Sequence, residues 1–271
     1  MYTSHFTNVG DLQTAFYDLG KGAPFVLVHG FTGSKLDFTS QIAWFVETHR
    51  VIAFDQRGHG ESSNLGPYSL DQLATDLLLF LDQLEIPTCH VLGHSMGGMV
   101  VMRALLRAPE RFRSAILMDT APEAIPFADS ALQEKIFTTV EAAGPIALFE
   151  GMRQAPAAPP VARGIEFLGA AEHWRRIKVK LEQMDSAAFV DLMTEMRGQN
   201  SLLEDLAELS LPTTILVGES DAPFRAPADA MHAAIPDSRL VVIPNAAHSP
   251  QYENADVWRD AVLAHLAAAT S

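Results

Sequence analysis

The stretch Gly93-His94-Ser95-Met96-Gly97 constrains the fold more than any other part of the chain. It has the pattern G-x-S-x-G and lies between an apolar run at 88–92, which predicts a buried strand, and residues 99–107, which predict a helix. The pattern therefore falls on a strand-to-helix turn, in which the serine backbone is strained. Gly93, Gly97 and Gly98 allow the strand and the helix to approach closely. We expect the Ser95 hydroxyl to project from the top of a sheet.

The remaining sequence alternates between strand and helix patterns. Residues 5–9 and 12–18 predict an opening antiparallel hairpin. Apolar runs predict further strands at 25–29, 50–55, 114–119, 213–218 and 239–244. Helical spacing or start signals predict helices at 37–48, after a capping box at 69–72, at 227–235 and at 256–268. This alternation predicts an α/β fold with a mostly parallel central sheet flanked by helices.

Composition and charge exclude several classes of protein. With 271 residues, of which 48% are hydrophobic, the chain can bury one large core. Its formal charge of −14 argues against binding nucleic acid or an anionic membrane. Cys89 is the one cysteine and lies in a predicted strand, so we expect a buried thiol and no intrachain disulfide.

Neither a cofactor nor a metal ion is expected. The run Gly58-His59-Gly60 lacks the third glycine and the helix start of a dinucleotide site, and no cluster has metal-ligand spacing. The first residues carry neither a basic region nor an apolar run of signal-peptide length, and no stretch reaches the length of a membrane span. We expect a cytoplasmic protein whose partner is a small molecule, and no oligomeric state is predicted.

Two glycine-containing loops extend the pattern around Ser95. The strand at 26–29 runs into Gly30-Phe31-Thr32-Gly33, where the Phe31 N–H could join the Met96 N–H as a second donor to a developing oxyanion. Another apolar run leads into 55–62. At these residues the chain resembles the α/β-hydrolase superfamily, specifically its serine esterase and lactonase-like branch. The resemblance covers nearly the whole chain except the middle, and it implies the α/β-hydrolase fold.

The resemblance also implies a catalytic triad in the chain order Ser, Asp or Glu, His. Ser95 needs a base, and His248 fits because it follows the last strand in a loop of small residues. Asp221 matches the family's usual acid position after the strand at 213–218. Asp119 is the main competitor, since some members place the acid there, and Glu219 falls earlier in the turn than Asp221. His29 and His94 are expected to support the loops beside Ser95 through hydrogen bonds.

The middle of the chain breaks the alternation. From 122 to 196 the sequence has only helical patterns, interrupted by Gly144-Pro145 and by the proline-rich residues 155–160. We interpret 122–196 as a helical cap inserted into a core domain of residues 1–121 and 197–271. A longer set of scaffold helices is the alternative. Most of the large apolar side chains of this segment are expected to pack within the cap, and a few are expected to face the substrate.

These features predict hydrolysis of a carboxylic ester or lactone, with a small to medium and largely apolar substrate. Met96, Met99 and Phe31 near the serine favour such a substrate. Three alternatives use the same triad: a carbon–carbon bond hydrolase, a lyase resembling the menaquinone-pathway synthase, and a slow-turnover ligand receptor. The lyases carry an arginine where this chain has Met99, and dehalogenases and epoxide hydrolases use an aspartate in place of Ser95.

Overall fold

The computed structural model describes residues 2–125, 130–155 and 159–269, and their centre is one eight-stranded sheet. The strand order is β1-β2-β4-β3-β5-β6-β7-β8. β2 pairs antiparallel with β1 and β4, and all other neighbours pair in parallel, which confirms the expected mostly parallel sheet. The strands are β1 (His5–Val9), β2 (Leu12–Leu19), β3 (Ala23–Val28), β4 (His49–Phe54), β5 (Cys89–His94), β6 (Phe112–Met118), β7 (Thr213–Gly218) and β8 (Arg239–Ile243).

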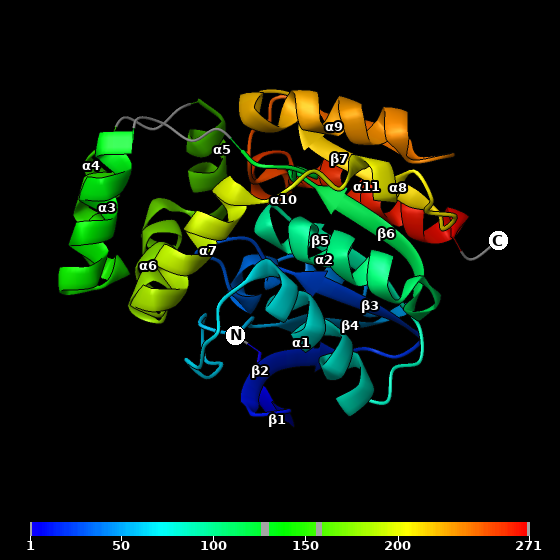
Figure 1. Ribbon diagram of the computed structural model, residues 1–271. Coiled ribbons are helices and arrows are strands. Elements are labelled where there is room, and N and C mark those ends of the chain that lie inside the picture. Colours follow the sequence, from blue (N-terminus) through cyan, green and yellow to red (C-terminus); the bar gives the residue numbers. More distant parts are fainter. Residues whose placement is uncertain (1, 126–129, 156–158, 270–271) are drawn as a thin grey trace.

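Alternate side chains of the central strands enter two separate hydrophobic clusters, one on each face of the sheet. On β3, Val26 and Val28 belong to the cluster that includes side chains of α1 (Leu70–Gln83), α2 (Met96–Arg107) and α9 (Ala222–Ala234). Phe25 and Leu27 belong to the cluster on the other face, which includes α11 (Ala255–Ala268). Helices therefore cover both faces of the sheet, as its continuous apolar strands require. Figure 1 shows α1 and α2 side by side over one face.

Between β6 and β7 the described residues form five helices and then the one-turn helix α8 (Leu203–Leu206), and no strand lies among them. In Figure 1 the helices α3, α4, α6 and α7 gather at one side of the sheet, beyond the ends of the parallel strands. The expected proline-rich break at 155–160 lies partly outside the described residues, at 156–158. The helices are α3 (Ser130–Ala143), α4 (Phe149–Gln154), α5 (Pro159–Leu168), α6 (Ala170–Glu182) and α7 (Ser186–Gly198), with the 3₁₀ turn η4 (Pro145–Leu148).

Three local expectations differ from the structure. Residues 37–48 do not form one helix but two 3₁₀ turns, η1 (Lys35–Phe38) and η2 (Ile42–Trp44). The helix expected at 227–235 begins earlier, at Ala222, so that Pro227 lies inside α9. Ser69 caps α1 by accepting the Gln72 N–H, but the Gln72 side chain donates to Asp76, so the capping box is incomplete. The remaining short elements are η3 (Pro109–Arg111) and α10 (Pro250–Glu253).

None of the helices in the described residues is long and apolar enough to cross a membrane.

Two buried histidines, His90 of β5 and His265 of α11, are linked by hydrogen bonds through the Ser114 hydroxyl of β6. The Ser114 hydroxyl lies 2.8 Å from His90 Nδ1 and 2.8 Å from His265 Nε2, and His265 Nδ1 lies 2.8 Å from the Thr214 hydroxyl. Burial lowers the pKa of His265 to about 4. In the unfolded chain the pKa of a histidine is about 6.5. Between these values the unfolded state binds the proton more readily, so stability falls as the pH falls from about 6.5 towards 4.

We predict that His265→Gln reduces the acid lability of the fold. In the wild type, protonation linked to this one side chain costs on the order of 1–2 kcal/mol between pH 7 and pH 5. The measurement is the free energy of unfolding at both pH values for the two proteins. His232→Gln provides the matched control, since it replaces an exposed histidine that lies outside this buried group of hydrogen-bonded side chains. An equal pH dependence in wild type and His265→Gln would contradict the prediction.

Candidate active site

Ser95 lies at the junction of β5 and α2 with a strained backbone. Its φ of 54° is in the left-handed region, which a non-glycine residue rarely adopts. The turn is held from both sides: the Ser95 N–H donates to the Met118 carbonyl at 2.8 Å, and the Thr120 hydroxyl donates to the Ser95 carbonyl at 2.7 Å. A side chain at Gly97 would place its Cβ 2.3 Å from the Val28 carbonyl oxygen, so only glycine permits this approach of α2 to β3.

The loop after β3 packs directly against Ser95. A Cβ at Gly30 would lie 2.9 Å from the Cβ of Ser95, which shows how closely the two backbones approach. In the described part of the chain, neither the Phe31 N–H nor the Met96 N–H donates to another group. Met96 is the first residue of α2, where backbone donors are unpaired and the helix dipole favours negative charge. Two free backbone donors are therefore present beside the serine.

His29 fixes the shape of this loop, as expected from the sequence. Its Nε2 accepts the Gln56 N–H at 3.0 Å, so its Nδ1 carries the proton and donates to the Gly30 carbonyl at 2.8 Å. The Gln56 side chain also donates to the His29 carbonyl at 2.7 Å. Burial lowers the pKa of His29 to about 4, which keeps the ring neutral at pH 7. The loop is thus held by hydrogen bonds that do not change near neutral pH.

A buried ion pair between Lys35 and Asp55 stabilises the loop that follows β3. Lys35 Nζ lies 2.5 Å from Asp55 Oδ2, and Asp55 also accepts the backbone N–H groups of Lys35 and Glu61. Both paired side chains are almost completely buried. Breaking such a pair leaves an uncompensated charge in a low dielectric, which costs about 3–5 kcal/mol. Asp55 therefore connects the loop after β4 to the turn that follows Phe31.

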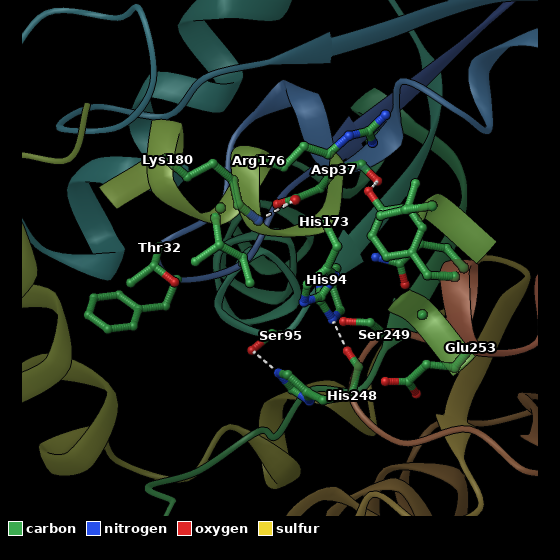
Figure 2. Close-up of a pocket in the computed structure, with 18 of the residues that line it drawn as sticks. Thr32, Asp37, His94, Ser95, His173, Arg176, Lys180, His248, Ser249 and Glu253 are labelled. Atoms are coloured by element: carbon green, nitrogen blue, oxygen red, sulfur yellow. Dashed lines mark hydrogen bonds and ion pairs between the residues drawn. The ribbon is translucent and has the colours of Figure 1, made fainter. Parts of the chain in front are cut away.

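His248 lies between Ser95 and Asp221 at hydrogen-bonding distance from both. Its Nε2 is 2.9 Å from the Ser95 hydroxyl, and its Nδ1 is 2.8 Å from Asp221 Oδ2 (Figure 2 shows the first contact). An imidazole that donates from Nδ1 to a carboxylate presents an unprotonated Nε2 to the hydroxyl. The Phe224 ring stacks on His248 with centroids 4.7 Å apart. The structure thus brings together the three residues that the sequence analysis singled out.

His94 supports His248 from the other side. Its Nε2 lies 2.7 Å from the His248 carbonyl oxygen, and the two rings are 5.0 Å apart. The contact requires a proton on His94 Nε2, which donates to the carbonyl. Burial lowers the pKa of His94 to about 3, so the ring stays neutral. The expected supporting role of this histidine agrees with the contact.

Asp119 and Glu219 do not contact His248. Asp119 is buried after β6, its Oδ1 accepts the Gly218 N–H at 2.8 Å, and its Oδ2 has no hydrogen-bond partner among the described residues. Burial, together with the charge of Asp221, raises the pKa of Asp119 well above its usual range. Glu219 accepts the Asn245 N–H instead. Of the three carboxylates considered from the sequence, only Asp221 is in hydrogen-bonding contact with the imidazole.

A cavity of about 250 Å³ opens beside Ser95. Apolar side chains form part of its wall, but Met96 and Met99, which were expected near the substrate, are buried in the core and do not line it. Of the large apolar side chains in the segment 122–196, Met152 reaches the cavity, together with Leu168, Ile177 and Leu181. The remaining wall is polar or charged and includes Thr32, Asp37, His173, Arg176, Lys180, Ser249, Gln251, Tyr252 and Glu253.

The polar residues from α6 were missed by the sequence analysis. His173, Arg176 and Lys180 are spaced by three and four residues, so they lie on one face of the helix. This spacing was visible in the sequence, but the same face also carries Ile177 and Leu181 and does not stand out as either polar or apolar. Nothing in the sequence showed that this face would point at Ser95.

Within the described residues, no group of three or more histidine, cysteine, aspartate or glutamate side chains could hold a metal ion.

Comparison with known proteins supplies relatives of several activities. A 3-oxoadipate enol-lactonase from Acinetobacter baylyi is 41% identical over 100 residues, which is 36% of this chain and 38% of that protein. A putative carbamate hydrolase from Azorhizobium caulinodans is 27% identical over 95% of this chain and 96% of its own length. The chain thus matches little more than a third of the first relative and nearly all of the second.

Solved structures and a family model agree on the fold. A thermophilic esterase from Thermogutta terrifontis, solved with malate bound, superposes with a TM-score of 0.84 at 27% identity, covering 99% of this chain and 100% of the esterase. The model of the alpha/beta hydrolase fold family matches residues 23–255. With this match over most of its length, the chain belongs to the alpha/beta hydrolase fold family.

Proposed function

We propose that this protein is a serine hydrolase that cleaves carboxylic esters or lactones through an acyl-enzyme. The observation that carries the proposal is the chain of contacts from Ser95 to His248 to Asp221, at 2.9 and 2.8 Å, beside two free backbone N–H groups. A nucleophile, a base and an orienting acid within hydrogen-bonding reach of one another are the signature of covalent acyl transfer. The lactonase and esterase among the relatives support the same class of reaction.

Each group has one role in the proposed reaction. The Ser95 hydroxyl attacks the acyl carbon while His248 Nε2 takes its proton. The N–H groups of Phe31 and Met96 stabilise the oxyanion of the tetrahedral intermediate, and Asp221 stabilises the imidazolium. His248 then protonates the leaving oxygen, which departs as an alcohol or, from a lactone, as the free end of the opened ring. Water, activated by the same imidazole, cleaves the acyl-enzyme and regenerates Ser95.

The helical segment 122–196 is proposed as the cap, and residues 1–121 and 197–271 as the core domain. Met152 of α4 and Leu168 of α5 line the cavity together with side chains of α6, so helices of this segment form its outer wall. The Phe31 ring packs on Phe189 of α7, with centroids 4.9 Å apart. This wall limits the substrate to a small or medium size, and its apolar part favours an acyl group with an apolar body.

We predict that Ser95→Ala lowers the turnover of p-nitrophenyl esters by at least about 10³-fold, because triad members act as a unit. The stability of the fold should remain nearly unchanged. A p-nitrophenyl series from acetate to decanoate would also size the acyl pocket. The matched control is Ser249→Ala, which removes another hydroxyl from the same cavity and should retain turnover within about tenfold of the wild type. Full activity in Ser95→Ala would refute the assignment.

A covalent probe separates this function from its alternatives. A fluorophosphonate should label the wild type on the peptide that contains Ser95, and should not label Ser95→Ala. Labelling without ester turnover would favour a carbon–carbon bond hydrolase, a lyase or a slow-turnover receptor with the same triad. The lyase has less support, because Met99 stands where those enzymes carry an arginine and is fully buried.

The acid of the triad can be tested with two isosteric variants. Asp221→Asn should lower kcat by about 10³- to 10⁴-fold, because an amide no longer stabilises the imidazolium or the required tautomer. Asp119→Asn keeps an oxygen to accept the Gly218 N–H, so kcat should fall by less than about tenfold. Steady-state kinetics on one p-nitrophenyl ester measures both. The reverse ranking would assign the acid to Asp119.

A further inference from the structure

The cavity beside Ser95 contains a lysine that uses only part of its hydrogen-bonding capacity. Lys180 of α6 lines the cavity, and its Nζ lies 2.5 Å from Asp37 Oδ1 (Figure 2). This is the one hydrogen bond that its ammonium makes within the described residues. An ammonium group has three donors. The side chain lines the cavity and is 17% exposed, so its remaining two donors are available to an acceptor inside the cavity.

The position of the lysine is fixed by the core. Asp37 Oδ2 accepts the Ser34 N–H, while Oδ1 faces Lys180. The Tyr252 hydroxyl donates to the Asp37 backbone carbonyl. Asp37 is therefore anchored on both its side chain and its backbone, and it holds the ammonium at one end of the cavity. Such an anchored charge is pre-organised for a ligand, because little side-chain freedom is left to lose on binding.

Two cations of α6, Arg176 and Lys180, line the cavity. Arg176 pairs with Glu172 at 2.7 Å, and Lys180 pairs with Asp37. Glu172 does not line the cavity, so the partner of Arg176 lies outside it and the partner of Lys180 lies within it. Glu253, the other carboxylate that lines the cavity, accepts the Ala247 N–H beside His248. Figure 2 shows Glu253 and Lys180 at opposite ends of the view, with Ser95 and His248 at the lower end.

We propose that the substrate carries a carboxylate at the end of its acyl group remote from the scissile bond, and that Lys180 binds this carboxylate. The inference rests on the proposed ester or lactone hydrolysis. The apolar side chains of Phe31, Ile177 and Leu181 line the same cavity and suit the body of the acyl group. A carboxylate is a strong acceptor for the two unused donors of the ammonium, because hydrogen bonds between two charged groups are shorter and stronger than neutral ones. Lys180 is thus a specificity-determining residue.

The test compares two esters that differ at one end. Mono-p-nitrophenyl adipate and p-nitrophenyl hexanoate have the same leaving group and a six-carbon acyl chain, which ends in a carboxylate or a methyl group. We expect the wild type to have a kcat/KM at least about tenfold higher for the adipate ester, since a hydrogen bond to a charged group is worth roughly that factor or more. Lys180→Met should lower the ratio of the two kcat/KM values by about 10- to 100-fold.

Two further variants keep the test decisive. Lys178→Met removes an equal charge from the same helix, but Lys178 is 53% exposed and pairs with Glu182, so the ratio should stay within about twofold of the wild type. The double variant Asp37→Asn with Lys180→Met leaves no unpaired carboxylate, and it should lose the preference as Lys180→Met does. This second loss excludes a trivial effect of a buried, unpaired Asp37.

Two outcomes overturn the inference. One is a wild type that prefers the hexanoate ester, and the other is an equal loss on both esters in Lys180→Met, which would show that Lys180 only holds α6 against η1. Either result leaves the proposed function intact if hydrolysis of the hexanoate ester still depends on Ser95. Hydrolysis that persists in Ser95→Ala would instead refute the proposed function, whatever the ratio.

Discussion

The left-handed backbone of Ser95 is the constraint on which the rest of the site depends. Such a conformation costs on the order of 1–3 kcal/mol and persists only where the surrounding structure over-determines it. Here β5 delivers the residue, α2 carries the chain away, and β6 holds it through the Met118 carbonyl and the Thr120 hydroxyl. The parallel core supplies this support, because β5 and β6 end together at one edge of the sheet. Ser95 is therefore positioned by tertiary structure and not by its own loop.

The same sheet edge collects the other groups of the site. Phe31 follows β3, Asp221 follows β7, and His248 follows β8. These three strands and β5, which precedes Ser95, each contribute one loop to the site. Parallel strands end at the same edge, and loops there are held by a rigid scaffold. Hydrogen bonds from neutral histidines then fix the loops: His29 holds the Gly30 turn and His94 holds the His248 backbone. The strained backbone of Ser95 persists because these hydrogen bonds prevent the surrounding loops from relaxing.

Much of the fold could be predicted from the sequence, because local sequence patterns indicate its strands and helices. Apolar runs marked the strands and the G-x-S-x-G pattern marked the turn. His248 and Asp221 were chosen because their places after strands match the order and positions of triad residues in the family that the sequence resembles. Residues 37–48 were predicted wrongly as one helix because Phe38, Ile42 and Phe45 are spaced by four and three residues, a spacing that consecutive 3₁₀ turns also accommodate. The start of α9 was misplaced because both Pro223 and Pro227 fit a first helical turn.

The lining of the cavity could not be predicted in the same way. Which face of α6 points at Ser95 depends on how the helical segment packs on the core, and no local pattern encodes that packing. The mixed face with Arg176, Ile177 and Lys180 is ambiguous by itself. Arg176 pairs with Glu172 of the same helix, but the partner of Lys180 is Asp37 of η1, which only the folded structure brings near. The positions of residues that follow the strands were therefore predictable, whereas the lining of the cavity, which depends on long-range packing, was not.

The tilted contact between the Phe31 and Phe189 rings has a consequence for how the protein can change. Phe31 carries one of the two free backbone N–H groups beside Ser95, and Phe189 belongs to α7, which packs against α3 outside the sheet. A substitution that shifts α7 therefore presses on the loop that bears this N–H, although α7 contributes no residue to the cavity lining. The position of this proposed oxyanion donor is thus coupled to the packing of a helix that does not contact the cavity, and a substitution in α7 would change the rate of the proposed reaction without changing the cavity wall.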